Sequence, residues 1–248
     1  LAMVYYNEGN YELALDYAHD AYDYSVYDLA WQAILSNWVG TNFVWILIVV
    51  LLVIAIVITF VLITRKKKGK LIRNQNTALM LNVPFHPFQS FTELKYHGKA
   101  SWPLALILTI LWYVSSVLKN TSSGFLYTDV TMSEYNSLYT LASTVGLLLL
   151  WSICNWLACS MLGGIGRFKE VYVATAYALM PVIIYAFISV VLSNFLPYSM
   201  AGIITGFGTA ITLYSFFLLC VGMIIVHEYD FFKVLWTGFI TLCMMLLV

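Results

Sequence analysis

Residues 227–230 are the part of this sequence that most resembles a metal-binding motif. His227 and Glu228 begin the His-Glu-x-x-His pattern with which zinc proteases hold their metal. The second histidine of that pattern would stand at position 231, where the sequence has Phe231. One histidine with Glu228 and Asp230 does not complete a zinc site without further ligands. We therefore predict no catalytic residue and no metal here, and expect these residues to face water at a helix end.

The cysteines offer no alternative site. The four of them lie in apolar stretches without a Cys-x-x-Cys pair. They are Cys154, Cys159, Cys220 and Cys243. We interpret them as small buried apolar residues, and we predict no cofactor.

Three glycines precede Arg167 in the pattern Gly-Gly-x-Gly. A phosphate-binding loop would need Gly-Lys and then Ser or Thr, between a strand and a helix. Here the chain runs through Arg167 into an apolar segment. We therefore interpret Gly163, Gly164 and Gly166 as a tight turn that needs positive φ.

Polar chemistry inside the apolar stretches is sparse. Asn155 is the strongest candidate, and we expect it to hydrogen-bond to a neighbouring helix rather than to bind a substrate. Weaker candidates are Ser143, Thr144, Thr175 and Ser189. Pro181 is expected to kink its helix. Gly202 and Gly206, followed by Gly208, are expected to form a small-residue face for close helix packing.

The elements that would position these residues are membrane helices. Apolar residues make up 62% of the 248 residues and charged residues 10%, against about 45–50% and about 25% in soluble domains. So little charge cannot cover the surface of a soluble protein. The composition excludes a soluble enzyme, a disordered tail and a nucleic-acid-binding protein, and it indicates an integral membrane protein.

We predict an all-α polytopic protein with about six transmembrane helices, because a span needs about 20 apolar residues. The six predicted spans are Phe43–Thr64, Trp102–Leu118, Leu138–Leu162, Val171–Leu192, Ile203–Val226 and Phe231–Val248. The last is short, and five spans is the alternative. One anchor would thus precede a bundle of five helices.

Charge distribution predicts the orientation of these spans. Cytoplasmic placement of residues 65–99, 163–170 and 227–233 puts eleven of the twelve basic residues inside and leaves only Lys119 outside. Six acids and no basic residue lie in residues 1–28, which would face the opposite side. Because an exported N-terminal segment needs a targeting signal, we expect the chain to be part of a longer protein.

Residues 1–40 are predicted to be an extracytoplasmic helical segment with an aromatic stripe. The run from Tyr5 to Ala18 has Gly, Tyr and Ala at the spacing that lets two helices pack closely. This segment resembles the tetratricopeptide repeat, a helix pair of 34 residues that binds peptides. The resemblance implies an interaction surface, for which the candidate residues are Tyr6, Tyr11, Tyr17 and Trp31. The alternative is a plain acidic hairpin that leads into the membrane.

Residues 65–99 are predicted to be a cytoplasmic linker. Its basic run stops transfer and attracts anionic lipids, at about 1 kcal/mol per basic residue. The expected lipid and interface residues are Arg65, Lys66, Lys67, Lys68, Phe88 and Phe91. Phenylalanines and Leu94 recur every three residues from Phe85, which favours a short helix in the membrane interface. A docking motif for a cytoplasmic partner is the alternative.

From Pro84 onward the order of features resembles the membrane domain of the Yip (Rab/Ypt-interacting protein) family. The shared pieces are a Pro-Phe amphipathic start, a polar loop after the first helix, the Gly-Gly-x-Gly turn, and an Ala-Tyr-Ala helix with Pro181. The resemblance implies a five-helix membrane domain, placed at residues 100–248. The additional span and acidic helices before it look more like prokaryotic members, and a bacterial cell membrane is the expected location.

Function is predicted from this resemblance rather than from a catalytic residue. We expect a non-enzymatic accessory or scaffold subunit of a membrane complex, with an ABC-type solute (sugar) importer, and its permease in particular, as the expected partner. One alternative is an autonomous transporter or channel whose path passes Asn155, Pro181 and residues 202–208. A second alternative is a membrane-organising or trafficking protein of the Yip type.

Overall fold

The structure is a computed structural model that describes residues 1–66, 75–127 and 135–247. All regular structure in the described residues is helical, as predicted. The chain forms two compact units. The first comprises residues 1–73 and 195–201, and the second comprises residues 74–194 and 202–248.

The first unit is built on a hairpin of α1 (Ala2–Asn7) and α2 (Tyr11–Asp20) packed against α3 (Tyr24–Lys66). Gly9 has φ +79°, which a glycine adopts without strain, and so allows the sharp turn between α1 and α2. The Asn10 side chain accepts a hydrogen bond from the Leu13 amide at 3.4 Å and caps α2. Ala14 and Ala18 are fully buried, because small side chains let the helices approach closely.

The segment 195–201, which includes a short 3-10 turn (Tyr198–Met200), belongs to the same unit. The Tyr198 amide donates to Asp28 Oδ1 at 2.7 Å, and Trp31 Nε1 donates to the Phe195 carbonyl at 3.4 Å. These two bonds join α3 to the segment 195–201. The predicted first span, 43–64, falls within α3, and most of its side chains lie outside the described part of the chain.

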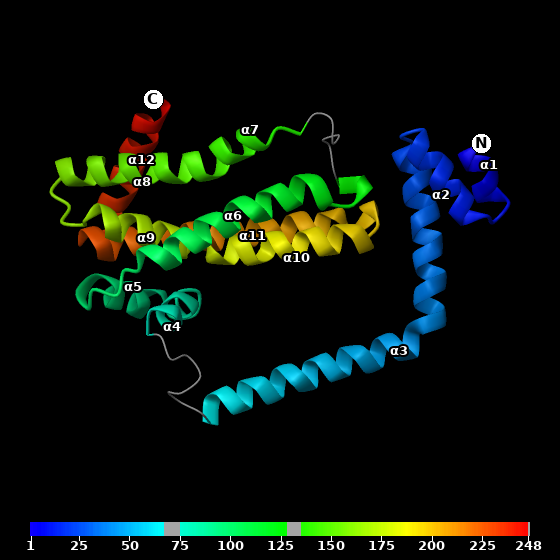
Figure 1. The fold of residues 1–248 in the computed structure, drawn as a ribbon, viewed down its shortest axis with the longest axis horizontal. Helices are drawn as coiled ribbons and strands as arrows, with labels where there is room; N and C mark the ends of the chain where they lie inside the picture. The colour runs from blue at the N-terminus through cyan, green and yellow to red at the C-terminus, as the bar shows by residue number, and fades with distance from the viewer. Residues whose placement is uncertain (67–74, 128–134, 248) are drawn as a thin grey trace. The chain divides into compact units, whose positions relative to one another are not determined.

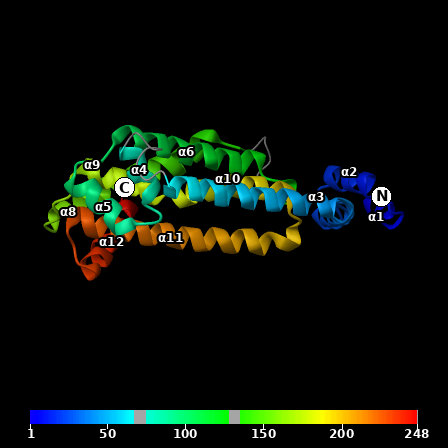
Figure 2. The same cartoon turned by 90° about the horizontal axis from the view of Figure 1, so that it is seen from below.

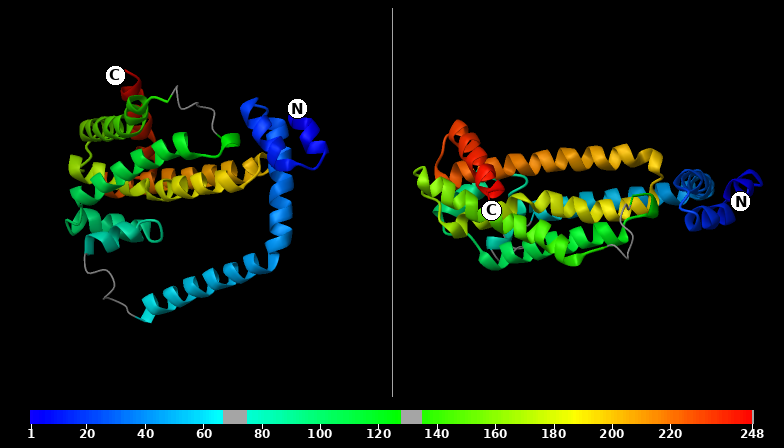
Figure 3. Two further views of the ribbon diagram at one scale, coloured as in Figure 1. Left: turned by 45° about the vertical axis from the view of Figure 1, so that its right-hand side comes forward. Right: turned by 90° about the horizontal axis from the view of Figure 1, so that it is seen from above.

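The second unit is a helical bundle. Its helices are α4 (Gln75–Asn82), α5 (Pro87–Tyr96), α6 (Trp102–Ser122), α7 (Ser137–Leu141), α8 (Leu147–Met161), α9 (Phe168–Ala178), α10 (Met180–Phe195), α11 (Ala201–His227) and α12 (Phe231–Leu246). In the views of Figure 1 and Figure 2, α6, α10 and α11 run roughly parallel. Helix α12 packs on α8 and crosses it, as Figure 3 shows.

Among the described residues of this unit, four helical stretches are long and apolar enough to cross a membrane. They are Trp102–Ser122, Ser137–Met161, Phe168–Phe195 and Tyr198–His227. Helix α12 is apolar but shorter, at 16 residues. The structure thus contains four of the six predicted spans as long membrane-type helices, and the count of six remains a prediction.

Two of these stretches are irregular. A π-helical turn at Ala142–Gly146 links α7 to α8, and such turns are frequent at functional sites. Helix α9 ends at Ala178, and α10 begins at Met180, one residue before Pro181. Proline has no amide hydrogen and its ring clashes with the preceding turn, which explains the interruption.

The core of the bundle lies around α9, whose residues from Val171 to Ala178 are all buried. Phe91 of α5 is also buried, and its ring would lie 3.4 Å from a Cβ at Gly222 of α11. Phe91 therefore lies in the core of the bundle and not at the membrane interface, where we expected it. Only one side of α5 is free of the bundle, and there Phe88 is 58% exposed.

Candidate functional site

The features that looked most chemical in the sequence meet at one end of the bundle. The end of α8, the glycine turn, the start of α9, the end of α11 and the start of α12 converge there, with α5 beside them. We call this region the closed end. It comprises Phe91, Lys95, Cys159, residues 163–170 and residues 226–233.

The glycine turn is shaped by two different requirements. Gly163 has φ +82°, so its backbone is in the left-handed region. The Gly164 amide donates to the Cys159 carbonyl at 2.8 Å, which closes the C-terminus of α8. The backbone at Gly164 and Gly166 does not have a positive φ. These two positions require glycine because neighbouring atoms leave no space for a side chain.

The atoms that exclude a side chain at these two glycines belong mainly to His227. A Cβ at Gly164 would lie 2.7 Å from His227 Nδ1 and 2.9 Å from the Cys159 carbonyl oxygen. A Cβ at Gly166 would lie 2.7 Å from Val226 Cγ1 and 2.9 Å from His227 Nδ1. The turn therefore serves as the surface on which the end of α11 packs.

The expectation that residues 227–230 face water is wrong for two of them. His227 is 2% exposed and Tyr229 is 5% exposed, and their rings stack with centroids 5.6 Å apart. Tyr229 Oη donates to the Cys159 carbonyl at 2.8 Å. The reason is the glycine turn, since the space that side chains at Gly164 and Gly166 would take is filled by these two rings.

A nearly buried ion pair joins α5 to the turn. Lys95 Nζ lies 3.0 Å from Glu170 Oε2, with the two side chains 10% and 14% exposed. Lys95 Nζ also donates to the Ile165 carbonyl at 3.3 Å, and Glu170 Oε2 accepts the Arg167 amide at 3.0 Å. One carboxylate thus holds the start of α9, the turn and α5 together.

Residues of α5 and α12 complete the closed end. Tyr96 Oη donates to Glu228 Oε1 at 2.6 Å, and this hydrogen bond to a carboxylate raises the pKa of Tyr96. Lys233 Nζ lies 4.1 Å above the centroid of the Tyr229 ring, a cation–π contact. Burial raises the pKa of the Tyr229 phenol, so it stays a neutral hydrogen-bond donor.

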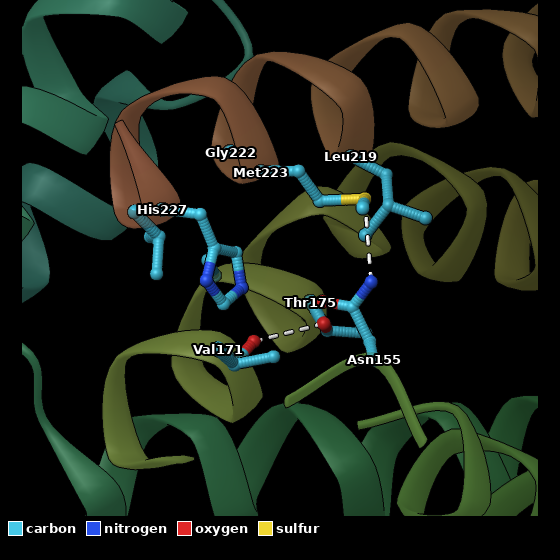
Figure 4. A pocket seen from close by; sticks show the side chains of 9 residues that line it. Asn155, Val171, Thr175, Leu219, Gly222, Met223 and His227 are labelled. Atoms are coloured by element: carbon cyan, nitrogen blue, oxygen red, sulfur yellow. Dashed lines mark hydrogen bonds between the residues drawn. The ribbon is translucent and has the colours of Figure 1, made fainter. Parts of the chain in front are cut away.

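Asn155 lines a small cavity that adjoins the closed end, shown in Figure 4. Its amide nitrogen lies 3.3 Å from Thr241 Oγ1 and 3.7 Å from Met223 Sδ. These contacts are the helix-to-helix kind expected for Asn155. Thr175 Oγ1 also lies at the cavity and donates to the Val171 carbonyl at 2.8 Å. Asn155 Oδ1 and the two ring nitrogens of His227 have no protein partner among the described residues.

The volume of this cavity, about 10 Å³, limits what it can hold. That is the space of about one water molecule, and its polar lining suits one. The cavity is too small for a solute. In the described part of the chain, no three His, Cys, Asp or Glu side chains are grouped as metal ligands.

The remaining predicted packing residues lie elsewhere. A Cβ at Gly202 or Gly206 would have no atom within 4 Å, so these two glycines do not form the expected close helix contact within the chain. Gly208 does, because a Cβ there would lie 3.0 Å from the ring of Tyr185 on α10. Of the three glycines in the predicted face, Gly208 thus makes the close approach of α11 to α10, and Gly202 and Gly206 do not.

In the first unit, the three predicted tyrosines form ring pairs. Tyr17 stacks on Tyr5 with centroids 5.2 Å apart, and Tyr6 lies 5.5 Å from Tyr11. Tyr17 is 42% exposed. Lys67 and Lys68 lie outside the described residues, as do the side chains of Arg65 and Lys66.

Reasoning from sequence missed His227, Tyr229 and the Lys95–Glu170 pair as one cluster. The available signal was the spacing of Gly164 and Gly166, which marks a surface without side chains. The charge pattern also placed residues 163–170 and 227–233 on the same side of the membrane.

Comparison with known proteins gives a single assignment. No curated protein and no solved structure matches the chain. The family profile described as the Yip1 domain matches residues 81–248, which include α5, the glycine turn, His227 and α12. The four long apolar helices and this match identify an integral membrane protein. The match covers more than half of the sequence, and the chain therefore belongs to the Yip1 domain family.

Proposed function

We propose that this protein is a non-enzymatic accessory or scaffold subunit of a membrane protein complex. Its family suggests a membrane-associated, non-catalytic protein. The observation that carries the proposal is a groove in the first unit, between the α1–α2 turn and α3. Seven residues line it, with a volume of about 560 Å³. They are Glu8, Gly9, Asn10, Tyr11, Glu12, Ile34 and Asn37.

The groove has the chemistry of a docking site for a basic segment. Glu8 and Glu12 supply two negative charges, and residues 1–28 contain no Lys or Arg to neutralise them. Tyr11 and Ile34 supply apolar area beside those charges. A partner with a Lys or Arg next to an apolar side chain complements both features. The helix pair would thus act as the tetratricopeptide-like interaction module.

Location and partner extend the same proposal. The charge pattern supports an extracytoplasmic N-terminus. The resemblance to prokaryotic members supports a bacterial cell membrane as the location. An ABC-type solute importer is the partner suggested by the resemblance to prokaryotic members. A cysteine introduced at the exposed Ser36 should react with a membrane-impermeant maleimide in intact cells. Labelling only after the cells are lysed would contradict this orientation.

The docking proposal is tested by purifying the protein from its native membrane in a mild detergent and identifying co-purifying chains by mass spectrometry. We expect a stoichiometric membrane partner with the unaltered protein and its loss with Glu8→Lys. The matched control is Asp20→Lys, which reverses an exposed charge on the same hairpin outside the groove. Purification of the unaltered protein as a single species would overturn the scaffold proposal and favour an autonomous role.

A further inference from the structure

A second, much larger cavity lies in the bundle, away from the closed end. It is a partly open cleft of about 830 Å³, within the range of small-molecule binding sites. Its walls are the second half of α6 with the turn that follows it, α7 with the π-helical turn before α8, α10, and the first half of α11. We call this cleft and its walls the open end.

The walls of the cleft are unusually rich in hydroxyl groups for helices of membrane type. Each wall contributes two or more polar side chains along one face. The hydroxyl-bearing residues are Ser116, Ser123, Tyr127, Thr140, Ser143, Thr144, Tyr185, Ser189, Ser193, Thr205, Thr209 and Thr212. On α11 the spacing of 205, 209 and 212 places all three threonines on one side of the helix. Lipid tails would select apolar residues there, so a polar occupant explains this pattern better.

The hydrogen bonds of the walls define what the cleft offers to a ligand. Most of these hydroxyls donate to a carbonyl in the preceding turn of their own helix. Examples are Thr209 to the Thr205 carbonyl at 2.9 Å and Ser189 to the Ala186 carbonyl at 2.8 Å. With its proton so engaged, each hydroxyl presents its oxygen to the cleft as an acceptor. The lining therefore suits a ligand with several hydrogen-bond donors.

The charge of the lining adds a second requirement. Lys119, on α6, is exposed, and it is the one charged side chain among the described residues that line the cleft. The described lining thus contributes one positive charge to the cleft. Trp112, Val182 and Leu213 supply apolar surface beside the hydroxyls. An anionic group, several donors and an apolar body are the three features that such a lining complements.

The end of the cleft is held in place by hydrogen bonds between side chains and backbone groups. The Gly124 amide donates to Ser193 Oγ at 3.1 Å, and Asn194 Nδ2 donates to the Ser122 carbonyl at 2.8 Å. A Cβ at Gly124 would overlap the Ser193 carbonyl oxygen, so only glycine fits there. These bonds tie the end of α6 to the end of α10 and make this side of the cleft a built structure.

We propose that the cleft binds the headgroup of an anionic, hydroxyl-bearing phospholipid. The phosphate pairs with Lys119, the glycerol hydroxyls donate to the wall oxygens, and the acyl chains leave along the apolar surface. A free phosphorylated or neutral sugar shares the donor chemistry but lacks the acyl chains. This proposal is independent of the docking groove, because its readout is bound lipid rather than a co-purified chain.

Native mass spectrometry of the purified full-length chain, with phosphatidylglycerol or phosphatidylcholine added in turn, tests the proposal. Thr209→Phe places a ring in the cleft, and Ala210→Phe places the same ring on the adjacent, exposed position outside it. We expect phosphatidylglycerol to bind about tenfold more weakly to Thr209→Phe, a cost of about 1.4 kcal/mol, and unchanged to Ala210→Phe. Equal binding to the two variants would overturn the proposal. Lipid bound at the basic run of residues 65–73 would give that result, because neither variant changes the run.

Lys119→Gln tests the charge, with Lys169→Gln at the closed end as its control. We expect Lys119→Gln to abolish the preference for phosphatidylglycerol over phosphatidylcholine and Lys169→Gln to retain it. The absence of any preference in the unaltered protein would overturn the headgroup assignment. Binding of a soluble disaccharide by calorimetry, lost in Thr209→Phe while lipid binding persists, would overturn the lipid and assign the cleft to a solute.

Discussion

The two ends of the membrane bundle use similar residue types for opposite purposes. At the closed end, glycines remove side chains so that His227 and Tyr229 fill the space. At the open end, Gly202 and Gly206 meet open space, and the hydroxyls of α11 face a cleft. Helix α11 itself changes character, from mainly exposed in its first half to mainly buried in its second. A small residue in a membrane helix therefore indicates close packing only where a bulky partner is available.

The largest expected effect is at the glycine turn. Gly164→Val should lower the free energy of unfolding by about 3 kcal/mol, because its Cβ would meet backbone at the Cys159 carbonyl as well as two rings. Gly202→Ala, in open space on a helix, should instead stabilise by up to about 1 kcal/mol. Thermal unfolding in detergent measures both. Similar midpoints for the two variants would remove the distinction between the ends.

The ion pair of the closed end should give the next largest effect. Lys95→Met leaves the Glu170 carboxylate nearly buried without its cation, and should cost about 2 kcal/mol after allowance for partial exposure. The double variant with Glu170→Gln should recover part of that loss. A double-mutant cycle of unfolding free energies measures the coupling. Strict additivity would show that the pair contributes nothing.

A single hydrogen bond of the closed end is tested by Tyr229→Phe. The ring remains in place while the Cys159 carbonyl loses the phenol donor, so we expect a cost of about 1 kcal/mol. Chemical unfolding of the detergent-solubilised protein measures it. Thr212→Val at the open end serves as the control, with an expected change within about 0.5 kcal/mol. A larger loss at Thr212 than at Tyr229 would reverse the comparison.

The smallest effect concerns pH. Lys99 Nζ lies 2.7 Å from Glu93 Oε2 and holds the pKa of Glu93 below its usual 4.5. A folded-state pKa below the unfolded value contributes stability above about pH 4.5, and that stability is lost as the pH falls through the folded value. The pair is partly exposed, so the loss is about 0.5 kcal/mol. Between pH 6 and pH 3, the unfolding midpoint of Glu93→Gln should fall less steeply than that of the unaltered protein. Parallel plots of midpoint against pH for the two proteins would contradict this.

Prediction from sequence succeeded where a single helix decides the outcome. The apolar runs, Gly163 in a left-handed turn and the interruption before Pro181 each follow from local physics. It failed where two helices meet. The period of three at Phe85, Phe88 and Phe91 indicated one amphipathic helix correctly, but did not show that Phe91 faces Gly222 rather than lipid.

Some properties of the protein thus follow from its sequence alone, and others depend on its tertiary structure. Composition, the charge pattern and the order of features from Pro84 onward were enough to predict a helical membrane protein and its family, because these depend on length and chemistry along the chain. Tertiary structure alone decided that His227 is buried, that Lys95 pairs with Glu170 across 75 residues, and that hydroxyls from several helices share one cleft. These facts depend on which helix faces lie opposite one another, and no periodicity within a single helix contains that information.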